Sequence, residues 1–540
     1  MFSFFSKKKP WTSPRAMENW IQKQLPVGDI HTSQQAALEL LKDYLQSESA
    51  LGYTCFPALW LLSECIESLL QQLMNTYLQN HRTSPTVEQL TREGLFELSQ
   101  RLSQVYEPII EEEPEVLLKT LKTEGIARSL VYYMHYKSLQ AKLRLYRFEP
   151  WMPAHWKTLH KSYSLAEKLN AHNIIIRLFE PTDSDSTSIT TSVELEYAHL
   201  LLLQLLNVGS FDANHIEHAH LWLMLNSNNI HIEKTVNAEG FAVNLNSSEG
   251  LIRASKIANN ILASPQHSEH IRFVNTYAIT TLLEQEIHAT RELLQETIDP
   301  GPMHVQLSLL TKWYGLWNHN NHFWNRKGDR EKVQDSHVWM VDDWNAMTQC
   351  CPPIMGSESS APPPIPVYTV GDQCKIIDKS RYGYGLIALA NESRPFRLGM
   401  LILLFDEEGA EWSVCVLRRI KKLNLDQIEL GIEILGRSIS SMKPYIPKKA
   451  KSYEGFDGYE IDSASPVENP NEDHTPTLYI KPQEETRAGD VPSLILLKKD
   501  YQRNKIFNLV LDSGLFKIKL DDAIETGTDW VWCKFSVQTE

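Results

Sequence analysis

The apolar residues of this chain follow two different periods, and the period changes once along the sequence. In the first half they recur three and four positions apart, as in Ser33 to Gln46 and Leu59 to Gln79, which predicts α-helices. From about Val333 they form short β-rich segments separated by turn residues, which predicts an antiparallel sheet or small barrel. The chain is therefore predicted to be a multidomain α+β protein, with a helical N-terminal region followed by an antiparallel β-barrel and a β-rich C-terminal extension.

A chain of 540 residues is too long for a single hydrophobic core, and changes in composition divide it. One island in the helical region alternates between apolar and polar residues and contains glycines, which predicts strands and a hairpin. Two stretches rich in proline, serine and acidic residues interrupt the β-rich part. The predicted organisation is a tail (1–14), a mainly helical domain (15–315) with a small β insertion near 229–254, a β-barrel (316–442) with a Pro/Ser-rich insertion (350–367), a polar linker (443–478) and a β-rich C-terminal extension (479–540).

Charge and cysteine usage argue against several classes of protein. The net charge of −14 does not favour capture of nucleic acid or of an anionic membrane, so a local cluster must hold any anionic ligand. Seven scattered cysteines without a C-x-x-C pair argue against a disulfide framework or a zinc site and fit a reducing cytoplasm. The most apolar run, which begins at His199, is too short to span a bilayer. We therefore expect a cytoplasmic protein with no integral membrane segment.

The first candidate binding motif is the polar run RKGDR, which places Arg326 and Arg330 four positions apart. Guanidinium groups are planar forks that bind phosphate through two hydrogen bonds and also stack on flat bases. Two arginines on one flexible segment can therefore turn toward a single anion. The alternative is a pair of solvated arginines beside Asp329 and Glu331, a common arrangement for such spacing.

The second candidate motif is DKSRYG, which lies between apolar segments. The carboxylate of Asp378 can accept two hydrogen bonds and so matches the N–H edge of guanine. Ser380 supplies a hydroxyl, and Gly383 allows the backbone to approach a ligand closely or to adopt a positive φ. The alternative is an ordinary β-turn, capped by Asp378 or Ser380 and closed by Gly383.

Together the two motifs resemble the PilZ family, whose members are receptors for the bacterial second messenger cyclic di-GMP. That family carries R-x-x-x-R on a loop that enters a β-barrel, and then [D/N]-x-S-x-x-G at a strand end. This chain has both motifs in that order, although they lie farther apart than in compact members. The segments RLGMLILLF, WSVCVLRRI and LGIEIL follow where the family has its later strands. The long helical region before the barrel resembles the arrangement in larger proteobacterial PilZ proteins.

The resemblance implies specific roles for individual residues. The two arginines would bind phosphates and stack on guanine, the acid and the hydroxyl would read a guanine edge, and the glycine would leave room for the base. The ligand-binding residues implied in this way are Arg326, Arg330, Asp378, Ser380 and Gly383, with Trp324 and Arg381 as additional candidates.

The function implied by the resemblance is binding, and neither an enzyme nor a cofactor is expected. Cyclic di-GMP would order the arginine loop against the barrel and so couple messenger binding to the helical region, as an output or interaction platform for an unidentified protein partner. Biofilm formation and motility are the processes such receptors imply, and homo-oligomerisation stays open. The alternative is a PilZ-like structural or adaptor protein of a motility, pilus or secretion assembly that does not bind nucleotide.

A third interpretation rests on three histidines, His215, His218 and His220. The first two could share a helix face and bind a metal. A metal site needs further ligands, however, and Glu217 lies on another face, while no H-E-x-x-H motif is present. Ordinary surface or packing histidines are therefore the favoured interpretation, and no metal is expected.

Overall fold

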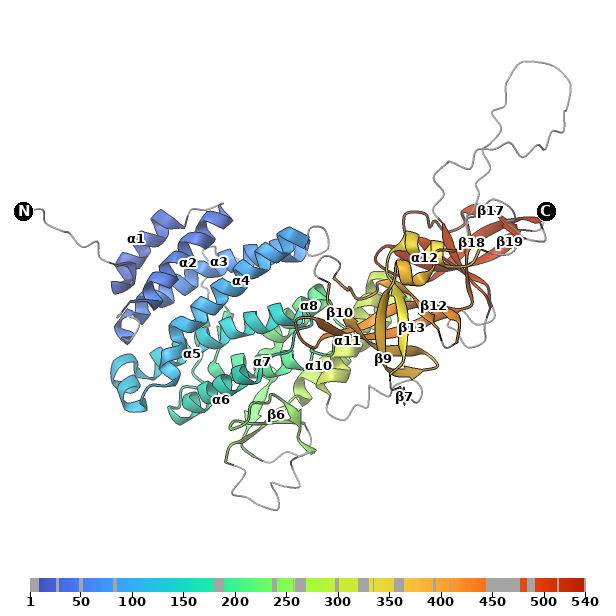
Figure 1. Ribbon diagram of the computed structural model, residues 1–540. Coiled ribbons are helices and arrows are strands. Elements are labelled where there is room, and N and C mark those ends of the chain that lie inside the picture. The colour runs from blue at the N-terminus through green and yellow to red at the C-terminus, as the bar shows by residue number, and fades with distance from the viewer. Residues whose placement is uncertain are drawn as a thin grey trace, which may run out of the picture. The chain divides into compact units, whose positions relative to one another are not determined.

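The computed structural model divides into two units, Met1–Asn325 and Arg326–Glu540, which we describe separately (Figure 1). The structure describes residues 9–25, 29–47, 52–80, 85–178, 189–235, 240–255, 257, 269–296, 301–318, 330–333, 335–353, 364–391, 395–407, 409–442, 476–482, 491–511 and 514–538. Two of the candidate site residues, Trp324 and Arg326, therefore lie outside the described residues.

The first unit is built mainly of helices (Figure 1). These are α1 (Pro14–Gln24), α2 (Ile30–Leu45), α3 (Phe56–Asn80), α4 (Pro85–Tyr106), α5 (Pro114–Leu145), α6 (Pro153–Lys168), α7 (Val193–Gln204), α8 (Ala213–Asn226), α10 (Tyr277–Glu296) and α11 (Gly301–Trp317). Short polar side chains begin several of them, because a side-chain oxygen satisfies a backbone N–H that has no partner in the first turn. Asp29 accepts from the N–H of Thr32, and Asp212 accepts from the N–H of His215.

Helix α5 lies at the centre of this unit, where it packs against α4 and α7. The rings of Tyr132, Tyr133 and Tyr136 on α5 are fully buried, and Tyr132 stacks on Tyr106 of α4 with ring centroids 5.6 Å apart. Burial of such large aromatic side chains contributes much of the apolar area that stabilises a helical core.

Two small sheets accompany the helices. One pairs β1 (Ile176–Leu178) with β2 (Ile189–Thr191), and the other has the order β3-β6-β4-β5. The four strands of the second sheet are β3 (His231–Glu233), β4 (Phe241–Asn244), β5 (Ile252–Arg253) and β6 (Ile271–Asn275). The predicted β island at 229–254 thus contains three of them, and β6 joins it from farther along the chain as the middle partner of β3 and β4.

The second unit begins with a closed antiparallel barrel. Its six strands are β8 (His337–Val341), β9 (Asp372–Ser380), β10 (Gly383–Leu389), β11 (Leu401–Asp406), β12 (Glu411–Lys422) and β13 (Gln427–Arg437). Their order is β10-β13-β12-β11-β8-β9, and pairing of β9 with β10 closes the circle. A short strand, β7 (Glu331–Lys332), pairs with β9, and helix α12 (Trp344–Cys350) follows β8. The predicted fold class, a helical region followed by an antiparallel barrel and a β-rich extension, is confirmed.

The C-terminal extension forms a second antiparallel sheet with the order β14-β15-β16-β19-β18-β17. Its strands are β14 (Ile439–Met442), β15 (Thr477–Ile480), β16 (Ser493–Leu497), β17 (Ile506–Leu511), β18 (Gly514–Thr526) and β19 (Trp530–Gln538). One buried cluster joins Leu403 and Val416 of the barrel to Ile495 and Trp532 of this sheet. The indole N–H of Trp530 also donates to the carbonyl of Gly399, with 2.9 Å between the heavy atoms. The barrel and the extension therefore share a core.

Within the described part of the chain, no helix combines the length and the apolar character that crossing a bilayer requires.

Candidate functional site

The barrel brings together two predicted site residues that lie 48 positions apart in sequence. The guanidinium of Arg330 donates to the carboxylate of Asp378 in an ion pair. Strand β7 holds this contact, because Lys332 lies opposite Asp378 and the N–H of Val333 donates to the carbonyl of Ile377 at 3.3 Å. The side chains of Arg330 and Asp378 are 26% and 18% exposed, so a ligand can reach both.

Gly385 on the neighbouring strand β10 leaves the space that the Asp378 side chain occupies. Gly385 lies directly opposite Asp378, and a Cβ at Gly385 would lie only 2.5 Å from Asp378 Oδ1. The Asp378 carboxylate therefore lies directly over Gly385, and a side chain at position 385 would push the carboxylate away. The register between β9 and β10 shifts next to this pair, at a β-bulge that re-aims the side chains at the strand end. Sequence reasoning did not identify Gly385 as part of the site.

Ser380 and Gly383 form the turn between β9 and β10. The hydroxyl of Ser380 donates to the carbonyl of Gly383 at 3.3 Å. This is the ordinary capped β-turn that was the alternative to a ligand site for this motif. A Cβ at Gly383 would lie 2.0 Å from the carbonyl oxygen of Ile432, so close approach of β10 to β13 requires this glycine. The structure thus gives both residues a role in the fold, and their contacts with a ligand stay a prediction.

Arg381 lies at the tip of the same turn. Its guanidinium carbon lies 5.8 Å from the ring centroid of Tyr382, and its carbonyl accepts from Arg437 at 3.4 Å. The turn between β9 and β10 therefore holds a guanidinium and an aromatic ring close to each other.

Next to Asp378 in sequence, Lys379 forms a separate charged contact. Its ammonium lies 2.7 Å from Asp406 and 5.4 Å from the ring centroid of Tyr384. Burial lowers the pKa of Lys379, but the hydrogen bond with Asp406 and the nearby charges outweigh it and raise the pKa overall. Lys379 is thus held as a cation by Asp406, whereas Asp378 pairs with Arg330.

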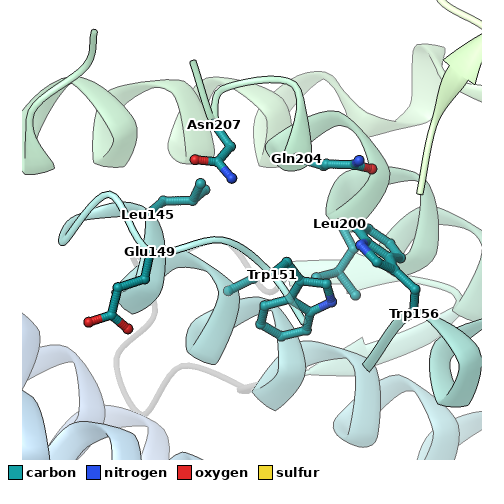
Figure 2. Close-up of a pocket in the computed structure, with 8 residues that line it drawn as sticks. Leu145, Glu149, Trp151, Trp156, Leu200, Gln204 and Asn207 are labelled. Carbon is teal, nitrogen blue, oxygen red and sulfur yellow. The ribbon is translucent and has the colours of Figure 1, made fainter. Parts of the chain in front are cut away.

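The helical unit contains a pocket, with an empty volume of about 310 Å³ that includes open solvent (Figure 2). It is lined by Ala141, Leu145, Glu149, Trp151, Trp156, Leu200, Gln204 and Asn207. The two indole rings have centroids 6.3 Å apart, and Gln204 Oε1 accepts from the N–H of Leu251. None of the residues predicted for the ligand site lines this pocket.

The three candidate metal-binding histidines do not converge. His220 Nδ1 lies 3.0 Å from Nε2 of His199, whereas His215 contacts Asp212 and His218 is exposed. Burial, with nearby Lys142, lowers the pKa of His199 to about 3 and that of His220 well below its usual value. Among the residues that the structure describes, no group of three or more His, Cys, Asp or Glu side chains is placed to hold a metal ion.

One comparison with known proteins bears on the helical half. Residues 15–237 match the family model described as the N-terminal domain of the cyclic-di-GMP receptor FimW. The helical half is similar to a domain of a cyclic-di-GMP receptor. The match supports the cyclic-di-GMP receptor part of the resemblance drawn from the barrel motifs, and it covers none of the barrel. No curated protein and no solved structure matches the chain.

Proposed function

We propose that the chain is a cyclic di-GMP receptor that binds the messenger on the outside of its barrel and acts through binding rather than catalysis. The observation that supports this most directly is the contact between Arg330 and Asp378, since it joins the two motifs that the PilZ resemblance assigns to one ligand. The match of residues 15–237 to a domain of a cyclic-di-GMP receptor supports the same conclusion from the other end of the chain.

The mechanism we propose is an exchange of partners at Asp378. Arg330 leaves the carboxylate for a phosphate of the ligand, and Asp378 then accepts the N–H groups of a guanine edge. Arg326, four positions earlier in the sequence, supplies the second guanidinium, and Ser380 and Gly383 border the base. The ligand shifts the loop toward this state only by its greater affinity for it.

The proposal extends to the rest of the chain. The helical unit serves as the output or interaction platform for a protein partner. The location is the cytoplasm, where the messenger and the reduced cysteines are both expected.

Nucleotide selectivity tests this function. A ligand that binds only the folded state stabilises it by RT ln(1 + [L]/Kd), so cyclic di-GMP should raise the melting temperature of the full chain in a concentration-dependent way. Cyclic di-AMP and GTP at the same concentrations should produce little or no shift, because adenine lacks the donor edge that suits Asp378 and GTP lacks the second base. Equal shifts with all three nucleotides would argue for a nonspecific anion site.

One observation favours a second function. Arg330 and Asp378 already neutralise each other, as expected of a PilZ-like adaptor whose site no longer binds nucleotide. Under this alternative, none of the three nucleotides shifts the melting temperature.

A further inference from the structure

A single row of residues crosses the strands next to the candidate site. In register, Asp378 on β9 lies opposite Gly385 on β10, Gly385 opposite Gly431 on β13, and Gly431 opposite Arg419 on β12. Two glycines thus lie side by side in the middle of the row, with an acid at one end and a guanidinium at the other.

This row lies on the outer face of the barrel. Leu386 and Leu430 face each other across β10 and β13, and both are completely buried. Ile420, opposite Leu430 on β12, is buried as well. Because successive side chains of a strand point to opposite faces, the adjacent Gly385, Gly431 and Arg419 point outward. The two glycines are buried beneath their neighbours, and a ligand can reach the row at the side chains of its two ends, Asp378 (18% exposed) and Arg419 (35% exposed).

The two glycines allow the flanking side chains to lie flat on the sheet. A Cβ at Gly431 would lie 2.9 Å from Cβ and 3.2 Å from Nε of Arg419, so the arginine side chain occupies the space over this glycine. Asp378 covers Gly385 from the opposite side in the same way. An ion pair with Glu429 anchors the Arg419 guanidinium, and the Arg419 side chain remains 35% exposed.

We propose that Arg419 belongs to the ligand site and that its guanidinium, held flat over Gly431 by Glu429, is the surface on which one purine base of the ligand stacks. A planar guanidinium offers a flat face for such stacking, which the tetrahedral ammonium of lysine lacks. Asp378 lies at the other end of the row, three strands away on the same face, where its carboxylate would accept from the edge of that base. This inference rests on the proposed receptor function and adds a residue outside its two motifs.

Calorimetric titration of the full chain with cyclic di-GMP tests the role of Arg419. Arg419→Lys keeps the charge and removes the flat face, and we expect it to weaken binding about tenfold or more, the usual loss when a base loses its stacking partner. Gly431→Ala lifts the side chain off the sheet and should also weaken binding. Arg503→Lys is the matched control, because Arg503 is well exposed and pairs with Asp522 in the C-terminal sheet.

The salt dependence of binding separates stacking from a phosphate contact. Because Arg419→Lys keeps the positive charge, we expect its affinity to fall while the slope of log Kd against log salt concentration stays that of the unmodified chain. An unchanged affinity in Arg419→Lys, with binding by the unmodified chain intact, overturns this inference and leaves the receptor function standing. A lack of binding by the unmodified chain overturns the receptor function itself.

Discussion

The ion pair between Arg330 and Asp378 has the properties of a contact that can exchange partners. Both side chains are partly exposed, and exposed ion pairs contribute only about 0–1 kcal/mol to stability. Breaking the pair therefore costs little, whereas two charge-assisted bonds to phosphate can gain more. Because the Arg330–Asp378 pair is weak, a ligand that binds either side chain more strongly can replace it.

The buried pair of His199 and His220 makes a prediction about pH. Burial and Lys142 lower both pKa values below the ordinary value near 6.5. As the pH falls, these histidines are therefore protonated in the unfolded chain before they are protonated in the folded chain. The two neutral histidines therefore do not lower the free energy of unfolding above about pH 6.5. Below that pH the free energy of unfolding falls by at most ~1.4 kcal/mol per pH unit for each histidine. Urea unfolding followed by circular dichroism at 222 nm should show the helical signal losing stability between pH 7 and 5.

The matched variant removes the titrating groups. His199→Gln/His220→Gln should make this pH dependence shallower, because glutamine does not titrate, while His155 and His160, whose pKa values burial also lowers, remain. An equally steep dependence in the double variant would assign the effect to other groups.

A second prediction concerns Gly383. An alanine there would place its Cβ 2.0 Å from the carbonyl oxygen of Ile432, so β10 must move away from β13. We expect Gly383→Ala to lower the free energy of unfolding by about 1–3 kcal/mol, as overpacking does. Gly409→Ala is the control, because the nearest atoms lie 3.9 Å from a Cβ there. Equal thermal denaturation midpoints for the two variants would contradict this account.

At this scale, the sequence identified the charged partners but not the glycines that hold them. Arg330 and Asp378 could be named as candidate site residues because each belongs to a recognisable motif, and the structure places the two in contact. Gly385, Gly431 and Arg419 carry no local signal. Their significance comes from the register of β9, β10, β13 and β12, and register is a property of the folded barrel rather than of any one segment.

Among the elements, β7 is the one on which the site most depends. It contains only two residues, and the bond from the N–H of Val333 to Ile377 continues its pairing with β9. Val333→Pro removes that N–H and should leave Arg330 less firmly positioned beside β9, where we propose that the ligand binds. Since a hydrogen bond contributes about 1 kcal/mol, we expect calorimetry to show cyclic di-GMP binding weakened on the order of fivefold to tenfold.

Val333→Ala is the control for this variant, because it keeps the N–H while shortening the side chain. It should bind like the unmodified chain, and both variants should keep the melting temperature of the barrel. Unchanged binding by Val333→Pro would show that β7 does not position the loop.

Periodicity predicted the long elements well, because their burial patterns repeat over many residues. The helical first half and the barrel strands are examples. Helix α12 was not predicted, since it spans only seven residues and ends at Cys350, where the Pro-rich insertion begins. Its start is marked by Asp343, which accepts from the N–H of Ala346. Strands β1 and β2 were also missed, because three residues each are too few to show a period.

In the second unit as a whole, the extension packs against the closed barrel and shares one buried core with it. Trp530 is 1% exposed, lies in the shared core and donates to Gly399 next to β11. Trp530→Ala should therefore destabilise the barrel by about 3–5 kcal/mol, the usual cost of removing a buried tryptophan. Thermal unfolding followed by near-ultraviolet circular dichroism measures this loss. Leu425→Ala, at a side chain that is 84% exposed, should change stability by less than about 0.5 kcal/mol.

A selective loss of signal from the C-terminal sheet in Trp530→Ala, with the barrel transition unchanged, would show that the two sheets unfold independently. The sequence predicts a β-rich C-terminal extension of the barrel after a polar linker. The shared core cannot be read from the sequence, since the alternation of apolar residues shows that a face is buried but not what buries it.

For the whole chain, the central claim is that the barrel binds cyclic di-GMP through Arg330 and Asp378. Calorimetric titration of the full chain with cyclic di-GMP tests it most directly, with Asp522→Ala as a control at an exposed acid of the C-terminal sheet. The account predicts saturable heat for the unmodified chain and for Asp522→Ala, and none for Arg330→Ala or Asp378→Ala. Absence of heat with the unmodified chain, or equal binding by all four proteins, would contradict it.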